Sequence, residues 1–164
     1  MRDAALESNT QRNRILNAMS NADLALLQPH LERVTLKFGQ SLQSPNKAIT
    51  NLYFPESGIA SLVVPANGAG RQAEIAIVGR EGMTGLPVVH GTDRSPFDIF
   101  IQIEGDGHRI AAEKLREALH QSITLLRTLA ALCPRLRYPS QLHGLSERAW
   151  LYRLKTGALA AHDA

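Results

Sequence analysis

The sequence predicts a mainly β protein with flanking helices, built on an antiparallel β-roll of the jelly-roll or double-stranded β-helix kind. Three observations carry this prediction. Hydrophobic residues recur at helical spacing near the N-terminus, alternate with polar residues through the middle of the chain, and return to helical spacing after residue 110. Many short strands separated by turn residues, with no long helices between them, are typical of rolls and barrels.

Two short helices are expected before the first strand. The first covers about residues 11–19. The second follows Ser20, whose hydroxyl can accept a free backbone N–H of the first turn, and Pro29 limits it to a couple of turns. Their apolar faces are formed by Ile15, Leu16 and Met19 in the first helix, and by Leu24, Leu27 and Leu31 in the second.

Strand candidates follow at short intervals. In the first, Glu32–Leu42, the residues Val34, Leu36 and Phe38 alternate with polar neighbours, which predicts one buried face, and Gly39 marks a bend. The other candidates are Ile49–Phe54, Gly58–Val64, Gln72–Val78, Phe97–Ile103 and His108–Ile110. Turn residues lie between them at Pro55-Glu56-Ser57-Gly58, Asn67-Gly68-Ala69-Gly70 and Gly105-Asp106-Gly107.

A helix of about 20 residues is expected from Ala111 onward. Its apolar stripe is formed by Leu115, Ala118, Leu119, Ile123, Leu126 and Ala130. Such a helix can pack on its own barrel or pair with a second copy of the chain, and the sequence favours neither. In the second case the dimer contacts are Leu115, Leu119, Ile123 and Leu126.

Composition restricts the class of protein. The chain has 164 residues, 44% of them apolar, which is enough for one domain with a core. No apolar run reaches the roughly 18 residues that span a bilayer, and the polar N-terminus is unlike a signal peptide, so a cytoplasmic location with no membrane partner is expected. The single cysteine, Cys133, excludes an internal disulfide and an iron–sulfur cluster ligated by this chain alone.

The positive charge is concentrated at the C-terminal end. Residues 133–164 hold five of the 18 Lys and Arg residues and two of the 15 Asp and Glu residues, so 13 of each remain before residue 133. The preceding body is therefore neutral and lacks the clustered bases that bind nucleic acid.

Four stretches resemble one family, in the family's order. They are Asn13–Glu32, Leu36–Leu42, Asn51–Gly58 (Asn-Leu-Tyr-Phe-Pro-Glu-Ser-Gly) and Val78–Gly85 (Val-Gly-Arg-Glu-Gly-Met-Thr-Gly). Over about Asn13–Leu132 the chain resembles the cyclic-nucleotide-binding-like sensor domain of Crp/Fnr transcription regulators. The resemblance implies an effector-binding roll that forms a homodimer through its long helix and signals to a helix-turn-helix domain.

The effector site is only partly present by the same resemblance. The family's cassette is Gly-Glu-Leu, followed after about ten residues by Arg-Ser/Thr-Ala. Gly85 matches the glycine, whereas Leu86 stands where a carboxylate would hold the ribose hydroxyl. Arg94 and Ser95 fall near the phosphate-binding pair. We expect a cavity with a small-molecule effector other than a cyclic nucleotide held in the familiar mode; the alternative is a functional cyclic AMP or cyclic GMP module.

No catalytic residues, metal ligands or cofactor are assigned. A β-roll also fits a metal-dependent cupin enzyme, but that site needs a His-x-His pair with further ligands, and His90-Gly91-Thr92-Asp93 is a turn. The six histidines are scattered, and no Gly-x-Ser-x-Gly or phosphate-binding loop is present. A non-enzymatic, regulatory protein is therefore expected, with the cupin as a further alternative.

Three regions are expected: a tail over residues 1–12, the roll and long helix over residues 13–132, and an irregular basic tail over residues 133–164. Both the helical period and the resemblance end at Cys133-Pro134, inside a helix that continues in the family. A frameshift after Leu132 explains such an end. The chain is then truncated before a helix-turn-helix domain, and we expect weakened dimerisation and no sequence-specific DNA binding.

Overall fold

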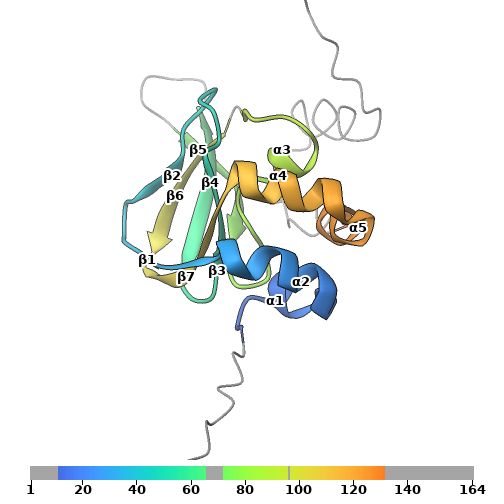
Figure 1. The fold of residues 1–164 in the computed structure, drawn as a ribbon. Helices are drawn as coiled ribbons and strands as arrows, with labels where there is room; N and C mark the ends of the chain where they lie inside the picture. The colour runs from blue at the N-terminus through green and yellow to red at the C-terminus, as the bar shows by residue number, and fades with distance from the viewer. Residues whose placement is uncertain (1–10, 66–71, 96, 132–164) are drawn as a thin grey trace, which may run out of the picture.

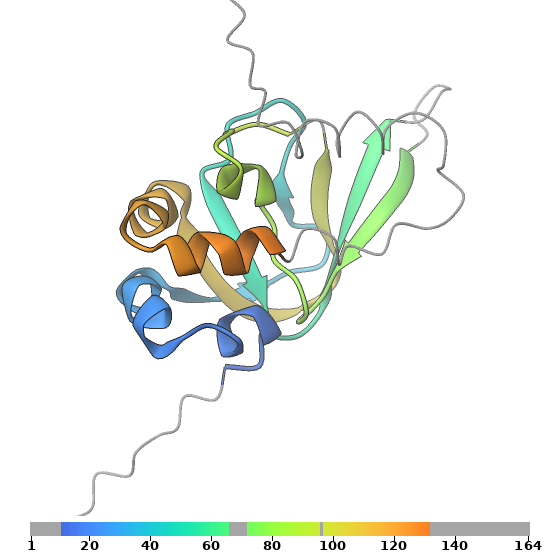
Figure 2. The same cartoon turned by 90° about the vertical axis from the view of Figure 1, so that its right-hand side faces the viewer.

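The computed structural model describes residues 11–65, 72–95 and 97–131. Helices gather on one side of the strands, and α3 lies at one end of the roll (Figures 1 and 2). The elements in order are α1 Arg14–Asn17, α2 Asn21–Leu27, the 3-10 helix η1 Gln28–His30, β1 Glu32–Leu36, β2 Ser41–Gln43, β3 Asn51–Pro55, β4 Ile59–Pro65, β5 Gln72–Val78, α3 Leu86–Val89, β6 Asp98–Ile103, β7 Gly105–Ala111, α4 Ala112–Gln121 and α5 Ile123–Ala131.

The strands form two antiparallel sheets. One has three strands in the order β1-β7-β3, and the other has four in the order β2-β6-β4-β5. Consecutive strands are rarely neighbours, because the chain crosses between the sheets as it winds around the roll. The mainly β, antiparallel architecture with flanking helices is thus confirmed.

Two apolar clusters form the core. One lies between the helices and the three-stranded sheet and includes Leu16, Leu27, Phe54 and Leu115. The other lies inside the roll, where residues of both sheets meet; its largest members include Leu36, Tyr53, Phe97, Ile99 and Ile101. The apolar faces predicted for the first two helices belong to the first cluster, with Leu24 and Leu31 at its margin.

The strand predicted over Glu32–Leu42 is wrong in its second half. β1 ends at Leu36, and the chain turns, with the Gln40 N–H donating to Lys37 O at 3.0 Å, before β2 enters the other sheet. Phe38 lies on this turn and is 75% exposed rather than buried. Gly39 adopts φ +72°, which reverses the chain between the two sheets.

The turn predicted at Gly105-Asp106-Gly107 is instead the start of β7. Gly105 pairs with Leu36 of β1, and Gly107 pairs with Pro55 of β3. A Cβ on Gly105 would lie 2.4 Å from the Ser57 carbonyl, and one on Gly107 would lie 2.5 Å from the Phe54 oxygen. These glycines therefore allow neighbouring backbone to approach β7 closely. A sequence pattern cannot distinguish a glycine needed for this close approach from a glycine needed for a turn.

The single helix predicted from Ala111 is two helices. Ser122 has extended backbone angles (φ −137°, ψ 113°), which end α4 and place the Ser122 side chain as the cap of α5. The proposed dimer residues accordingly differ in exposure: Leu115 is fully buried in the domain's own core, Leu119 and Leu126 are partly buried, and Ile123 is 58% exposed.

Among residues 11–65, 72–95 and 97–131, no helix is long and apolar enough to cross a membrane. The predictions made for residues 1–10 and 133–164, including the basic tail and the frameshift, fall outside the part of the chain that the structure describes.

Candidate functional site

Three of the four predicted effector residues, Gly85, Leu86 and Ser95, lie together at the end of the roll that carries α3. Gly85 precedes α3 with φ +74°, and a Cβ there would lie 2.6 Å from Leu52 Cγ of β3. Glycine therefore lets the chain turn into α3 while packed against β3. Pro87 lies in the first turn of this helix, where its missing N–H has no helical partner to lose.

Leu86 and Ser95 line an interior cavity below α3. The cavity has a volume of only about 20 Å³, room for about one water molecule. Its wall is mostly apolar and consists of Gln43, Leu62, Val78, Met83, Thr84, Gly85, Leu86, Pro87, Ser95, Phe97 and Ile99. Leu86 is buried and belongs to the core cluster between the helices and the three-stranded sheet, so an apolar side chain stands at the position that the resemblance gives to the ribose carboxylate.

Arg94 lies outside this wall. Its exposed guanidinium donates to Asn46 O at 3.2 Å and lies 3.7 Å from the Asp93 carboxylate. Ser95 is buried, but its Oγ accepts from the Phe97 N–H at 3.1 Å and its carbonyl accepts from the Asn46 N–H at 2.7 Å. The fold thus brings Gly85, Leu86 and Ser95 to one cavity and directs Arg94 to the surface.

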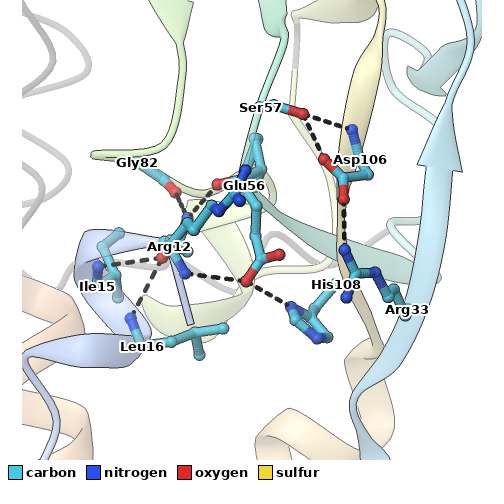
Figure 3. Close-up of polar contacts among 11 residues, drawn as sticks. Arg12, Ile15, Leu16, Arg33, Glu56, Ser57, Gly82, Asp106 and His108 are labelled. Carbon is cyan, nitrogen blue, oxygen red and sulfur yellow. Dashed lines mark hydrogen bonds and ion pairs between the residues drawn. The ribbon is translucent and has the colours of Figure 1, made fainter. Parts of the chain in front are cut away.

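A second polar centre, around Asn13, was not predicted as such (Figure 3). The Asn13 side chain is fully buried. Its Nδ2 donates to Pro55 O at 2.8 Å and to Gly82 O at 2.9 Å, while its Oδ1 accepts from the N–H groups of Ile15 and Leu16. Asn13 therefore caps α1 and joins it to the end of β3 and to the loop that contains Gly82.

Neighbouring bonds extend this attachment. The Arg14 N–H donates to Arg80 O at 2.7 Å, and the Arg12 N–H donates to Glu56 Oε1 at 3.1 Å. The buried Glu56 carboxylate also lies 3.5 Å from His108 Nδ1, and Figure 3 shows it pointing between the two. Arg12, Asn13 and Arg14 are thus bonded to the stretches Asn51–Gly58 and Val78–Gly85, which carry the family resemblance. We call the surface that these two stretches form under the N-terminal residues the seat.

An open cleft of about 370 Å³ lies beside this seat. Its wall consists of Glu56, Ser57, Gly58, Ile59, Ile77, Gly79, Arg80 and Glu81.

The sequence could have identified Asn13 as a helix cap, since it directly precedes the first apolar helical residues. Its bonds to Pro55 and Gly82 depend on residues 42 and 69 positions away, which only the tertiary structure brings near.

Asp106 connects the same seat to β1. Ser57 Oγ donates to Asp106 Oδ1, and Arg33 Nη2 donates to Asp106 Oδ2 at 2.8 Å. The Ser57 hydroxyl above all, and then Arg33, hold the pKa of Asp106 below its ordinary value. These bonds fix the turn between β3 and β4 against β7.

Replacing Asp106 by asparagine is expected to lower the free energy of unfolding by about 1 kcal/mol at pH 7, a small value because this carboxylate is 35% exposed. Since the folded pKa lies below the unfolded one, the contribution is present above the unfolded value near 3.9 and is lost as the pH falls through the folded pKa. Urea unfolding of both proteins from pH 7 downward measures the difference, which should shrink below about pH 4. A difference independent of pH would contradict this assignment; Asp93→Asn, at an exposed loop position, is the control.

Among the residues that the structure describes, no group of three or more His, Cys, Asp or Glu side chains could hold a metal ion.

Solved structures of regulatory proteins share this fold. The N-terminal domain of a transcriptional regulator from Streptomyces coelicolor A3(2) matches with a TM-score of 0.58 and 20% identity, over 76% of this chain and 87% of that one. The catabolite activator protein of Thermus thermophilus matches with a TM-score of 0.61 and 16% identity, over 74% of this chain and 56% of its own. The sensor domain of the transcriptional regulator DNR from Pseudomonas aeruginosa matches with a TM-score of 0.59 and 15% identity, over 74% of this chain and 81% of its own.

No protein-family model matches the sequence, and no curated protein matches it. The structural likenesses establish the fold: it is the one found in the sensor domains of transcription regulators and in cyclic-nucleotide-binding domains. The jelly-roll of this type predicted from the sequence is therefore confirmed.

Proposed function

We propose that residues 13–132 are the effector-sensing domain of a Crp/Fnr-type transcription regulator, and that this domain does not bind a cyclic nucleotide in the familiar mode. The fold shared with regulator sensor domains and the four resembling sequence stretches support the first part. The proposal assigns no catalysis and no sequence-specific DNA binding to these residues, and it includes a homodimer formed through α5.

The filled interior cavity carries the second part of the proposal. Pockets that enclose small molecules typically have volumes of about 300–1,000 Å³. The interior cavity has about 20 Å³, and the buried Leu86 is one of the residues that line it. Leucine also has no acceptor for a ribose hydroxyl, and an unpaired buried hydroxyl costs about 1–3 kcal/mol. Arg94, the one cation expected to meet the phosphate, is engaged at the surface.

Calorimetric titration of the full chain with cyclic AMP and with cyclic GMP tests this part. We expect no saturable binding up to about 1 mM of either nucleotide, because a standard free energy beyond about −4 kcal/mol would require the missing contacts. Arg94→Ala is expected to give the same flat titration. Micromolar binding that disappears in Arg94→Ala would overturn the proposal in favour of a functional cyclic-nucleotide module, for which the spacing of Gly85 and Arg94 is the favourable observation.

A further inference from the structure

A buried carboxylate joins α2 to the break between α4 and α5. Asp23 is only 3% exposed. Its Oδ1 accepts from Ser122 Oγ, both of its oxygens lie 2.9 Å from Thr124 Oγ1, and its Oδ2 accepts from Ser20 Oγ at 2.9 Å. Three hydroxyls from two segments, 99 positions apart in the case of Ser122, therefore converge on one side chain.

The carboxylate also lies at the N-terminal ends of two helices. Asp23 is in the first turn of α2, and Ser122 caps α5 by accepting from the Leu125 N–H at 3.2 Å. Negative charge is favourable at both positions. The Ser122 bond, opposed by burial and aided by the Ser20 and Thr124 bonds, holds the pKa of Asp23 below its ordinary value. Asp23 therefore stays ionised and bonded at neutral pH.

α5 is held both by apolar contacts and by these hydrogen bonds, and the two kinds of contact depend differently on its direction. Leu125 and Leu129 of α5 are fully buried in the core, and α5 also contacts α3, which covers the interior cavity. Apolar burial depends on area and not on angle, whereas hydrogen bonds weaken steeply when they are bent. Ser122, where the two helices meet, both donates from its Oγ to Asp23 and accepts the Leu125 N–H.

We propose that Asp23, with Ser122 and Thr124, is a latch that holds α5 in one direction relative to the roll. Release of the latch lets α5 turn at Ser122. This inference rests on the proposed function for its meaning: in a sensor that dimerises through α5, the direction of α5 decides how Ile123 and Leu126 meet a second copy of the chain. In that case α2, which lies outside the interior cavity, controls how α5 meets the second copy.

Distance measurements between spin labels test the latch in the full chain. Cys133→Ser first removes the native cysteine. Arg127→Cys on α5 and Thr35→Cys on β1, both at exposed positions, then carry the labels. The parent protein should give one narrow distance distribution. Asp23→Ala should broaden or shift it and speed the hydrogen exchange of α5 amides about tenfold, with the core strands unchanged.

Matched variants separate the latch from general stability. Thr124→Val, which removes one donor at nearly constant shape, should shift the distribution in the same direction by a smaller amount. Ser20→Ala removes the cap of α2 but leaves the bonds from Ser122 and Thr124, so the distribution should stay narrow.

An unchanged distribution in Asp23→Ala would show that Leu125 and Leu129 set the direction of α5, and the latch would be wrong. Equal acceleration of exchange in α5 and in the core strands would assign Asp23 to overall stability and would also overturn it. If Asp23→Ala does not fold, the double variant Ser122→Ala/Thr124→Val, which removes the two hydroxyl donors near the start of α5 and leaves Asp23 in place, gives the same decision. None of these outcomes depends on nucleotide binding, so the latch and the proposed function can fail separately.

Discussion

Asn13→Ala is expected to lower the free energy of unfolding by about 3 kcal/mol. The substitution removes a helix cap, which is worth about 1 kcal/mol. It also leaves the Pro55 and Gly82 carbonyls, both bonded to Asn13 Nδ2, without that donor in a buried place, at a further cost of about 1–3 kcal/mol. The loss is large for one polar side chain because the same amide bonds to N–H groups of α1, to the carbonyl at the end of β3 and to the Gly82 carbonyl.

Urea unfolding of the full chain measures this effect, and Asn17→Ala is the matched control. Asn17 ends the same short helix and is exposed, so its replacement should change the free energy of unfolding by less than about 0.5 kcal/mol. Equal values for the two variants would mean that the seat around Asn13 contributes nothing beyond helix propensity.

Leu86→Glu is expected to destabilise the protein by about 3–5 kcal/mol at pH 7, although it restores the residue type of the nucleotide-binding cassette. The cavity of about 20 Å³ has no room to hydrate a carboxylate, and its wall is mostly apolar. The loss should be smaller near pH 4.5, because the neutral acid is less costly to bury than the ion.

The volume-conserving Leu86→Met, expected to cost less than about 1.5 kcal/mol, separates lost packing from buried charge. Urea unfolding gives the stabilities, and calorimetry with cyclic AMP gives the binding. A Leu86→Glu protein as stable as the parent, with micromolar affinity for the nucleotide, would show that the cavity opens readily and that residue 86 alone had blocked it.

Local patterns predicted the elements well where a single local rule applies. Ser20 caps α2 as expected, with its Oγ accepting from the Asp23 N–H, and β5 begins and ends at the predicted residues. The stretch around Phe38 was misassigned because alternation continued through a turn whose purpose is to change sheets. Gly105 and Gly107 predict a turn from the sequence, because the sequence shows that a side chain is missing but not that neighbouring backbone approaches the glycine.

The positions of the predicted effector residues followed from the sequence only in part, and their role in binding stays a prediction. Three of the four residues, Gly85, Leu86 and Ser95, share one cavity, because they lie close in sequence to the same tight connection over α3. The direction of Arg94 could not be predicted, since its partner Asn46 is 48 positions away. The break at Ser122 could not be predicted either: the apolar stripe continues through it, and the carboxylate that accepts from its hydroxyl belongs to α2, 99 positions away.

By itself, the sequence determined the antiparallel β-roll with flanking helices, the apolar faces that form its core, and the absence of a ribose-binding carboxylate at residue 86. The roll and its apolar faces follow from periodicity and residue type, which act over a few positions, and the missing carboxylate follows from the resemblance of Gly85-Leu86 to the family's cassette. The tertiary structure alone decided that the cavity is nearly filled, that Asn13 joins α1 to the end of β3 and to the loop at Gly82, and that α4 ends at Ser122, whose side chain bonds to Asp23. Each of these depends on bonds or packing between residues far apart in sequence, whose free energy exists only once the chain has folded.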